Sequence, residues 1–168
     1  MEFNYEVNPD YNAFYRNGLE FQKAAERCLA MDDDGSIHMF QDNRICILVA
    51  PAVVNSSFAC EMYLKSLILK SGKTYPTGKN GHNLKYMFDM LPESMRDIII
   101  QSCCSGASNA EDRFDSFLDE HSKDFVDARY YVTKEGWQGM SPILVYTYTH
   151  NIGVITKYLL DSCKEEML

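Results

Sequence analysis

The sequence lacks the signatures of several common protein classes. It has no apolar run suited to crossing a membrane, because polar residues interrupt its most apolar region, 142–160. It has no glycine-rich phosphate loop: Gly72, Lys73 and Thr74 are adjacent, but the upstream glycine and strand of that motif are missing. The N-terminus has no basic patch followed by an apolar stretch, so we predict no secretory signal. These absences predict a cytoplasmic protein without membrane contact.

Cysteine patterns typical of metal sites or disulfide frameworks are also missing. The six cysteines form no Cys-x-x-Cys motif, and the histidines and cysteines show no zinc-ligand spacing. We therefore predict reduced thiols that mostly pack in the core. Cys103 and Cys104 have no base nearby in the sequence, so neither is predicted to be a nucleophile. We expect no metal and no cofactor.

The charge is unevenly distributed along this acidic chain. The formal net charge is -8, which disfavours nucleic-acid binding across the whole surface. Between Met62 and Phe88 there is no Asp or Glu, whereas five lysines and one histidine occur there: Lys65, Lys70, Lys73, Lys79, His82 and Lys85. Either this segment receives an anion, or its lysines only solvate a loop and its flanks.

Helical periodicity runs through most of the chain, and no segment shows the sustained alternation of a strand. Apolar residues recur at helical spacing in predicted helices over 10–31, 43–70, 83–91, 92–104, 110–131 and 142–164. The glycine-rich segment 71–81 is predicted to be a loop. The sequence therefore predicts a single all-α domain over residues 1–168, built as one bundle of about six helices.

Start signals support several of these helices. Asn8 with Pro9 is predicted to start the first helix, and Ser141 with Pro142 the last. Asn83 is predicted to cap the short helix after the loop, since an Asn side chain accepts hydrogen bonds from the first helical N–H groups.

Three residues at the lysine-rich segment are candidates for a site. Glu61 precedes Lys65 by one helical turn, the favourable order for an ion pair. This pair is either a weak surface contact or a half-buried one that orients Lys65 toward a ligand. His82 lies at a helix start, where the charged form of an imidazole is disfavoured. It either acts as a base or hydrogen-bond acceptor, or pins the loop to the bundle.

Polar residues further along the chain form a second group of candidates. Arg129 either pairs with an acid across the bundle or presents its planar guanidinium to a phosphate or carboxylate. Tyr130 beside it either stacks on a base or packs in the core. His121 and His150 lie among apolar residues, so we predict structural roles in the bundle interior for both.

The order of three motifs resembles the HEPN family, the higher eukaryotes and prokaryotes nucleotide-binding domains. The motifs are FACEMYLKSLIL at 58–69, GHNL at 81–84 and the Arg129-Tyr130 pair, and the resemblance runs from about 53 to 131. It implies an α-helical bundle that commonly forms a homodimer and binds a nucleotide or RNA. It also implies a prokaryotic defence or toxin–antitoxin context, in which a nucleotidyltransferase is a frequent partner protein.

Many members of that family cleave RNA without a metal, using an arginine and a histidine closely spaced in sequence. The nearest pair here, Arg113 and His121, is separated by residues 114–120, one more than the family spacing. One extra helical residue turns the histidine by about 100°. We therefore predict a HEPN-like domain that binds a nucleotide or RNA. A metal-independent endoribonuclease and a non-catalytic dimeric interaction module are the alternatives.

The residues predicted to contact the ligand share charge, hydrogen-bonding capacity or a position in the three motifs. They are Glu61, Lys65, Lys79, His82, Asn83, Arg129 and Tyr130. His82 and Arg129 are the candidates for a catalytic role: His82 near the reacting or recognised group, and Arg129 as a clamp on the phosphate.

Overall fold

Helices make up most of the part of the chain that can be described. The computed structural model describes residues 10–37, 40–41, 44–45, 48–104, 108–122 and 141–162. In chain order its elements are α1 (Tyr11–Cys28), β1 (Phe40–Gln41), β2 (Arg44–Ile45), α2 (Val49–Lys70), the 3-10 turn η1 (Gly78–Asn80), α3 (Leu84–Asp89), α4 (Glu93–Cys103), α5 (Ala110–His121) and α7 (Pro142–Ser162). The predicted all-α bundle is confirmed.

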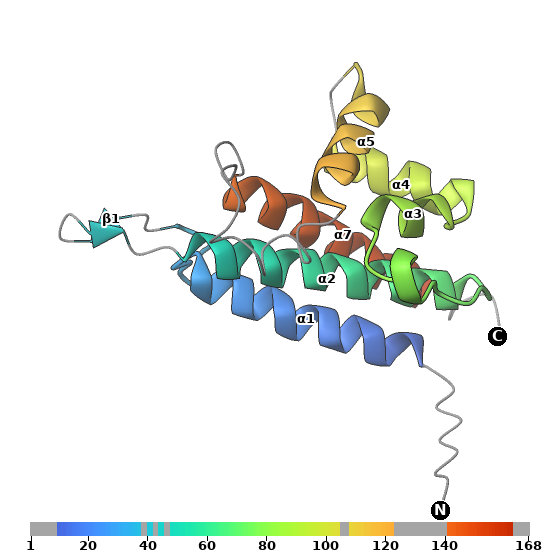
Figure 1. Ribbon diagram of the computed structural model, residues 1–168, viewed down its shortest axis with the longest axis horizontal. Helices are drawn as coiled ribbons and strands as arrows, with labels where there is room; N and C mark the ends of the chain where they lie inside the picture. Colours follow the sequence, from blue (N-terminus) through green and yellow to red (C-terminus); the bar gives the residue numbers. More distant parts are fainter. Residues whose placement is uncertain are drawn as a thin grey trace, which may run out of the picture.

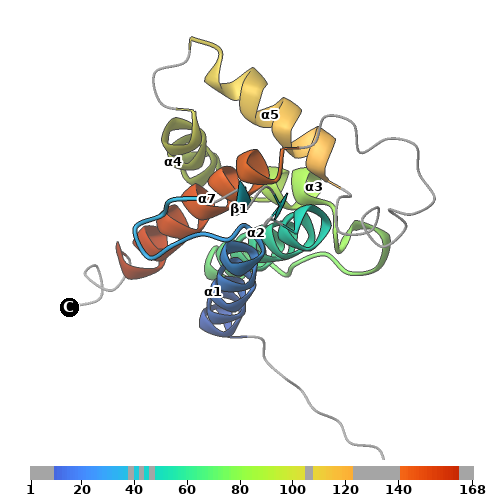
Figure 2. The ribbon, with the colours of Figure 1, turned by 90° about the vertical axis from the view of Figure 1, so that its left-hand side faces the viewer.

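In the described part of the chain, three long helices form the body and three shorter ones cover one side of it. The helices α1, α2 and α7 run side by side and contact one another (Figure 1). The shorter helices α3, α4 and α5 pack together and contact α2 and α7, on the side away from α1 (Figure 2). Among the described residues, no helix combines the length and the apolar character needed to span a bilayer.

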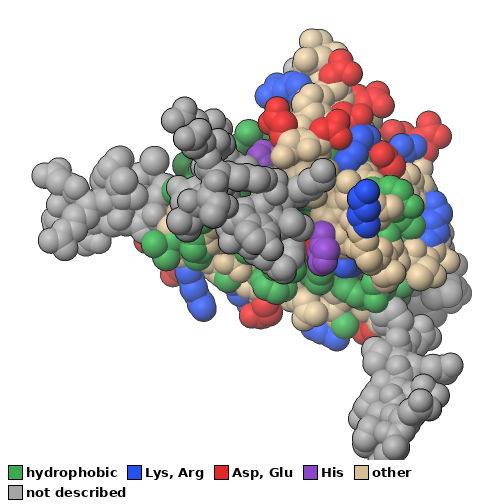
Figure 3. Space-filling view, viewed as in Figure 1, with side chains coloured by type: hydrophobic (Ala, Val, Ile, Leu, Met, Phe, Trp, Pro, Cys, Tyr) green, Lys and Arg blue, Asp and Glu red, His purple; other side chains and the backbone are tan. Residues whose placement is uncertain are grey.

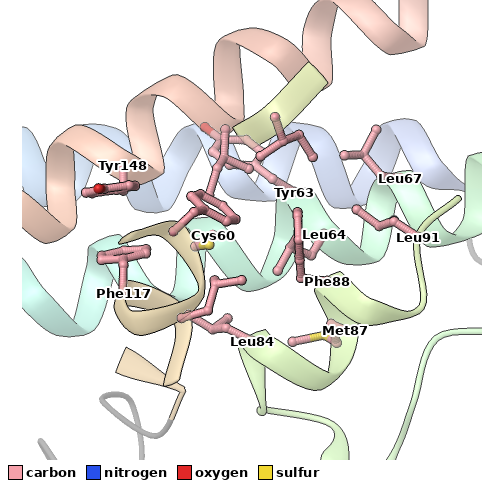
Figure 4. Packing of buried hydrophobic residues seen from close by; sticks show 14 of the residues in the cluster. Cys60, Tyr63, Leu64, Leu67, Leu84, Met87, Phe88, Leu91, Phe117 and Tyr148 are labelled. Atoms are coloured by element: carbon pink, nitrogen blue, oxygen red, sulfur yellow. The ribbon is translucent and has the colours of Figure 1, made fainter. Parts of the chain in front are cut away.

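The central helix is α2, because its sequence is apolar on nearly every side. Most of its residues between Ala52 and Ile68 are buried, as expected for a helix without a polar face. Figure 4 shows how this helix builds the core with its neighbours; the labelled side chains are Cys60, Tyr63, Leu64, Leu67, Leu84, Met87, Phe88, Leu91, Phe117 and Tyr148. Polar side chains carried by this same helix are therefore held at fixed positions in a packed interior.

Two glycines allow α1 and α7 to approach α2 closely. Both face the buried ring of Tyr63. A Cβ atom added at Gly18 would lie 2.5 Å from Tyr63 Cε1, and one added at Gly153 would lie 2.7 Å from Tyr63 Cε2. The hydroxyl of Tyr63 donates to Gln22 Oε1 at 2.7 Å. The ring is therefore enclosed between two helix backbones and fixed at its polar end.

The predicted start of the second helix is wrong. The helix predicted over 43–70 begins at Val49, with Pro51 in its first turn, where the N–H that proline lacks has no helical acceptor. Before it lies a short antiparallel hairpin, in which Phe40 pairs with Ile45. Strands of two residues are too short to show a period-two pattern in the sequence.

The first helix also differs from its prediction at both ends. Asn8 and Pro9 lie outside the described residues, and Asp10 caps α1 by accepting a hydrogen bond from the Asn12 N–H at 2.9 Å. The helix ends at Cys28 rather than at 31, since Ala30 adopts a positive φ of 50° that a right-handed helix does not allow.

The starts of the later helices agree with their predictions. The Asn83 side chain accepts from the Tyr86 N–H at 2.8 Å and caps α3. Ser141 Oγ accepts from the Leu144 N–H at 3.2 Å at the start of α7. The helix predicted over 110–131 begins at Ala110 and is described as far as His121; its remaining part falls largely outside the described residues.

Candidate functional site

A buried carboxylate on α2 joins two of the predicted site residues. Glu61 is only 2 % exposed. Its Oε1 accepts a hydrogen bond from Lys65 Nζ at 2.6 Å, and its Oε2 lies 2.9 Å from His82 Nδ1. Lys65 is one turn further along the same helix, whereas His82 reaches Glu61 from the turn that precedes α3. The structure therefore brings together Glu61, Lys65 and His82.

The Glu61–Lys65 pair is buried, so the interpretation as a surface contact is wrong. Lys65 is 8 % exposed, and its Nζ also lies 5.3 Å from the centroid of the Tyr75 ring. A buried ion is stable only when it is paired and hydrogen-bonded. Each of these two side chains thus supplies the charge that makes burial of the other tolerable.

The position of Glu61 fixes which nitrogen of His82 carries the proton. An ionised carboxylate can only accept hydrogen bonds, so the contact with Glu61 requires a proton on Nδ1 of His82. When His82 is neutral, Nε2 is then the acceptor nitrogen; when it is charged, both nitrogens are donors. The His82 side chain is 46 % exposed. The carboxylate thus orients an imidazole that is in part accessible to solvent.

Two lysines near the C-terminal end of α2 contact groups that carry no negative charge. Lys70 Nζ lies 5.0 Å from the centroid of the Tyr11 ring, and Lys73 Nζ donates to the carbonyl oxygen of Met90 at 2.6 Å. Neither partner is an acid. Both ammonium groups therefore contribute positive potential at this end of the helix.

The other two lysines of the segment differ in their surroundings. Lys85 Nζ lies 2.8 Å from Asp89 and 3.1 Å from Asp115, so two carboxylates offset its charge. Burial lowers the pKa of Lys85, but the hydrogen bonds to Asp89 and Asp115 outweigh this effect and raise it overall. Lys79 is exposed on η1 and has no ion pair or hydrogen bond within the described ranges. Of the two, Lys79 is the one whose charge a ligand can use.

Acidic side chains gather on a different part of the surface. Figure 3 shows most of the red side chains over α4 and α5. The segment from Met62 to Phe88 contributes none of them. The turn η1 and the start of α3 lie within 62–88, the longest stretch of the sequence without an acidic residue, and we call residues 78–83 the η1–α3 corner.

Asn83, Arg129 and Tyr130 complete the set of predicted site residues. Asn83 uses its side-chain oxygen to cap α3, so it shapes the corner beside His82. Arg129 and Tyr130 lie outside the described residues, and their contact with a ligand stays a prediction.

The two other candidate histidines occupy different environments. His121 is 5 % exposed and its ring centroid lies 4.8 Å from that of Phe117, which confirms its predicted place in the interior. His150 is exposed, so its predicted burial is wrong. The neighbouring Thr149 points into the core instead, and His150 lies on the flank of α7 with its Nδ1 3.2 Å from Gln22 Nε2.

Two cysteines of the described chain are poorly suited to nucleophilic chemistry. Burial raises the pKa of the Cys60 thiol far above its usual range, and burial with a smaller contribution from Cys104 raises the pKa of Cys103 to about 12. Neither forms a thiolate readily at neutral pH, so neither is a suitable nucleophile. The described residues contain no cluster of three or more side chains able to hold a metal ion.

The chain matches no family model, no curated protein and no solved structure. The resemblance to HEPN domains rests on the order of the three motifs alone.

Proposed function

We propose that this chain is a HEPN-like domain that binds a nucleotide or RNA through a phosphate group at the η1–α3 corner. The observation that carries the proposal is the contact between buried Glu61 and half-exposed His82, at 2.9 Å. Keeping a carboxylate in the core has a free-energy cost. Here the carboxylate of Glu61 also orients the half-exposed imidazole of His82, which we propose is its role in binding.

His82 and Lys79 supply the proposed phosphate contacts. With Nδ1 hydrogen-bonded to Glu61, the Nε2–H of the charged imidazole would be the group that donates to a phosphate oxygen. Lys79 lies in the preceding 3-10 turn and adds an exposed ammonium group. Lys73 adds a third positive charge nearby in the sequence. Since the segment has no acid, the local potential favours an anion although the whole chain is acidic.

The resemblance to HEPN domains implies two further ligand contacts, from residues that lie outside the described ranges. Arg129 would clamp the phosphate with its guanidinium, and Tyr130 would stack on a base. A homodimer, a nucleotidyltransferase partner and a defence or toxin–antitoxin context belong to the same proposal.

The second candidate function is metal-independent RNA cleavage, which the Glu61–His82 pair favours. A carboxylate that accepts from Nδ1 leaves neutral Nε2 as a base, the usual arrangement for proton abstraction. His82 would take the proton of a ribose 2′-hydroxyl, and the 2′-oxygen would attack the adjacent phosphorus. The bond to the 5′-oxygen would break, giving a cyclic phosphate and a 5′-hydroxyl once that oxygen is protonated. Arg129 would stabilise the charge on the phosphorus group.

Binding is tested with His82→Ala and Lys79→Gln. Each variant should weaken binding of a short end-labelled RNA by about ten- to one-hundred-fold, because one charge-assisted hydrogen bond is worth about 1.5–3 kcal/mol. Fluorescence anisotropy in EDTA measures the affinity. The matched control is Lys157→Gln on α7, which removes one exposed lysine paired with Asp161 and leaves the corner intact. If all three variants lose affinity equally, binding is non-specific and the corner is not the site.

Cleavage is tested in the same samples by following the labelled RNA over time. A product ending in a cyclic phosphate, made by the wild type and not by His82→Ala or Arg129→Ala, would establish the ribonuclease. If the RNA stays intact although the protein binds it tightly, the binding function is supported and the ribonuclease is excluded. A folded wild type that binds neither RNA nor nucleotide would overturn both and favour the dimeric interaction module, which sedimentation analysis would then reveal as a homodimer.

A further inference from the structure

A pocket unrelated to the η1–α3 corner lies between α1, α7 and the segment that follows α1. Figure 2 shows that segment, in light blue, running beside α7. The pocket has a volume of about 560 Å³, which is in the range of small-molecule sites. Glu26 and Arg27 line it from α1, Asp33 from the following segment, and Tyr146 and His150 from α7. It is therefore large enough for a ligand of monosaccharide size.

A chain of hydrogen bonds fixes the polar groups of this pocket. Glu26 Oε1 accepts from Gln22 Nε2 at 3.0 Å and from the Tyr146 hydroxyl at 2.8 Å. Gln22 Oε1 in turn accepts from the hydroxyl of Tyr63, which is buried at the centre of the bundle. The amide of Gln22 can have only one orientation, because its nitrogen must face the carboxylate. The pocket is thus tied to the core through Tyr63.

The same orientation determines the tautomer of His150. Gln22 Nε2 is a donor and lies 3.2 Å from His150 Nδ1, so Nδ1 accepts and the proton of the neutral ring lies on Nε2. His150 therefore offers a donor to a ligand. Glu26 Oε2 has no hydrogen bond within the described part of the chain and offers a charged acceptor.

The charge of the pocket favours a cation. Asp32 and Asp34 have interactions of their own, and the remaining charged residues of the lining are the acids Glu26 and Asp33 and the bases Lys23 and Arg27. Lys23 has its own acid, since its Nζ lies 3.6 Å from Glu20. Burial and the hydrogen bond to Glu26 raise the pKa of Tyr146, which keeps the phenol neutral and acting as a donor to the carboxylate. The described residues provide no metal-ligand cluster, so the carboxylates are not arranged for a bare metal ion.

We propose that this pocket binds a small hydroxylated organic amine, of which an amino sugar is the model. The ammonium group would pair with Glu26, and a ligand hydroxyl would accept from the Nε2–H of His150. Asp33 would add a second acceptor at the rim. The groups that define the ligand are the acceptor Glu26 and the donor His150. Both are held in place by hydrogen bonds to Gln22, and the aspartates of the rim only add negative charge.

The proposal is tested by calorimetry on the whole chain with glucosamine and with glucose, which differ in the ammonium group. Glucosamine should bind about ten-fold or more tighter than glucose, because only it can pair with the carboxylate. Glu26→Gln should remove that difference while keeping the contacts to Tyr146 and Gln22, since an amide oxygen still accepts. Glu93→Gln on α4 changes the net charge equally and should leave binding unchanged.

Two outcomes would overturn the amine site. One is equal binding of the two sugars, or no binding of either, by the wild type. The other is an equal loss of glucosamine affinity in Glu26→Gln and Glu93→Gln. If Glu26→Gln fails to fold, Asp33→Asn at the exposed rim should still weaken glucosamine binding by about three-fold, through the lost attraction alone; unchanged affinity there counts against the site. RNA binding at the η1–α3 corner is unaffected by either result, so the two proposals fail separately.

Discussion

Replacing Glu61 with leucine is expected to destabilise the protein by about 3–5 kcal/mol. The substitution leaves the ammonium group of Lys65, which is 8 % exposed, without its counter-charge at 2.6 Å. It also removes the acceptor that holds His82. Urea denaturation followed by circular dichroism measures the free energy of unfolding, since a small two-state domain unfolds in a single transition.

The double variant Glu61→Leu with Lys65→Met is the matched control. It removes both charges and replaces them with apolar side chains of similar size, an exchange that is often close to neutral. We therefore expect it to regain most of the lost stability. A Glu61→Leu variant that loses less than about 1 kcal/mol would contradict the burial of an interdependent pair, as would a double variant that is no more stable than the single one.

Gly153→Ala is expected to destabilise the protein by about 1–3 kcal/mol, although alanine is the better helix former by about 1 kcal/mol. The new Cβ would lie 2.7 Å from Tyr63 Cε2. The ring cannot move away, because the backbone at Gly18 encloses its other edge and its hydroxyl is bonded to Gln22. Thermal unfolding of the variant measures the effect.

The same substitution made together with Tyr63→Leu separates packing from helix propensity. Without the ring there is nothing for the Cβ to meet, so Gly153→Ala should be neutral or stabilising in that background. A single Gly153→Ala variant with a raised melting temperature would show that α7 is not held against Tyr63 as described. Gly18→Ala on α1 is expected to behave in the same way, with a Cβ at 2.5 Å from the ring.

The helices could be predicted because their signals are local. Asn83 and Ser141 lie at the helix starts they were predicted to mark, and the helical spacing of apolar residues located α2 through its buried stretch. The hairpin that pairs Phe40 with Ile45 has no comparable signal, since each strand has only two residues. The length of α1 was overestimated because nothing in the sequence indicates that Ala30 adopts a positive φ.

The candidate site could be predicted only in part, because its central contact joins distant residues. The spacing of Glu61 and Lys65 predicts a pair on one helix, and this pair forms. The contact between Glu61 and His82 depends on how the turn before α3 packs on α2, which no local pattern encodes. Whether the pair is buried also depends on what covers that face of α2.

The hydrogen-bond network of the pocket has only a weak signal in the sequence, which can be identified once the structure is known. Gln22 and Glu26 are one helical turn apart, as are Tyr146 and His150, so each pair shares a helix face. Their convergence requires the packing of α1 on α7, which depends on Gly18, Gly153 and the ring of Tyr63. The predicted burial of His150 was wrong because its apolar sequence neighbours face the core while it does not.

NMR of the His82 ring nitrogens, during titration with a short RNA and with a nucleoside monophosphate, tests the central claim most directly. The expected result is a proton on Nδ1 in the free protein and a shift of the Nε2 signal on binding, with both lost in Glu61→Gln. His82 signals that stay unchanged at saturating ligand would contradict the account. A proton on Nε2 alone would do so too, because Glu61 would then not be orienting the imidazole toward a phosphate.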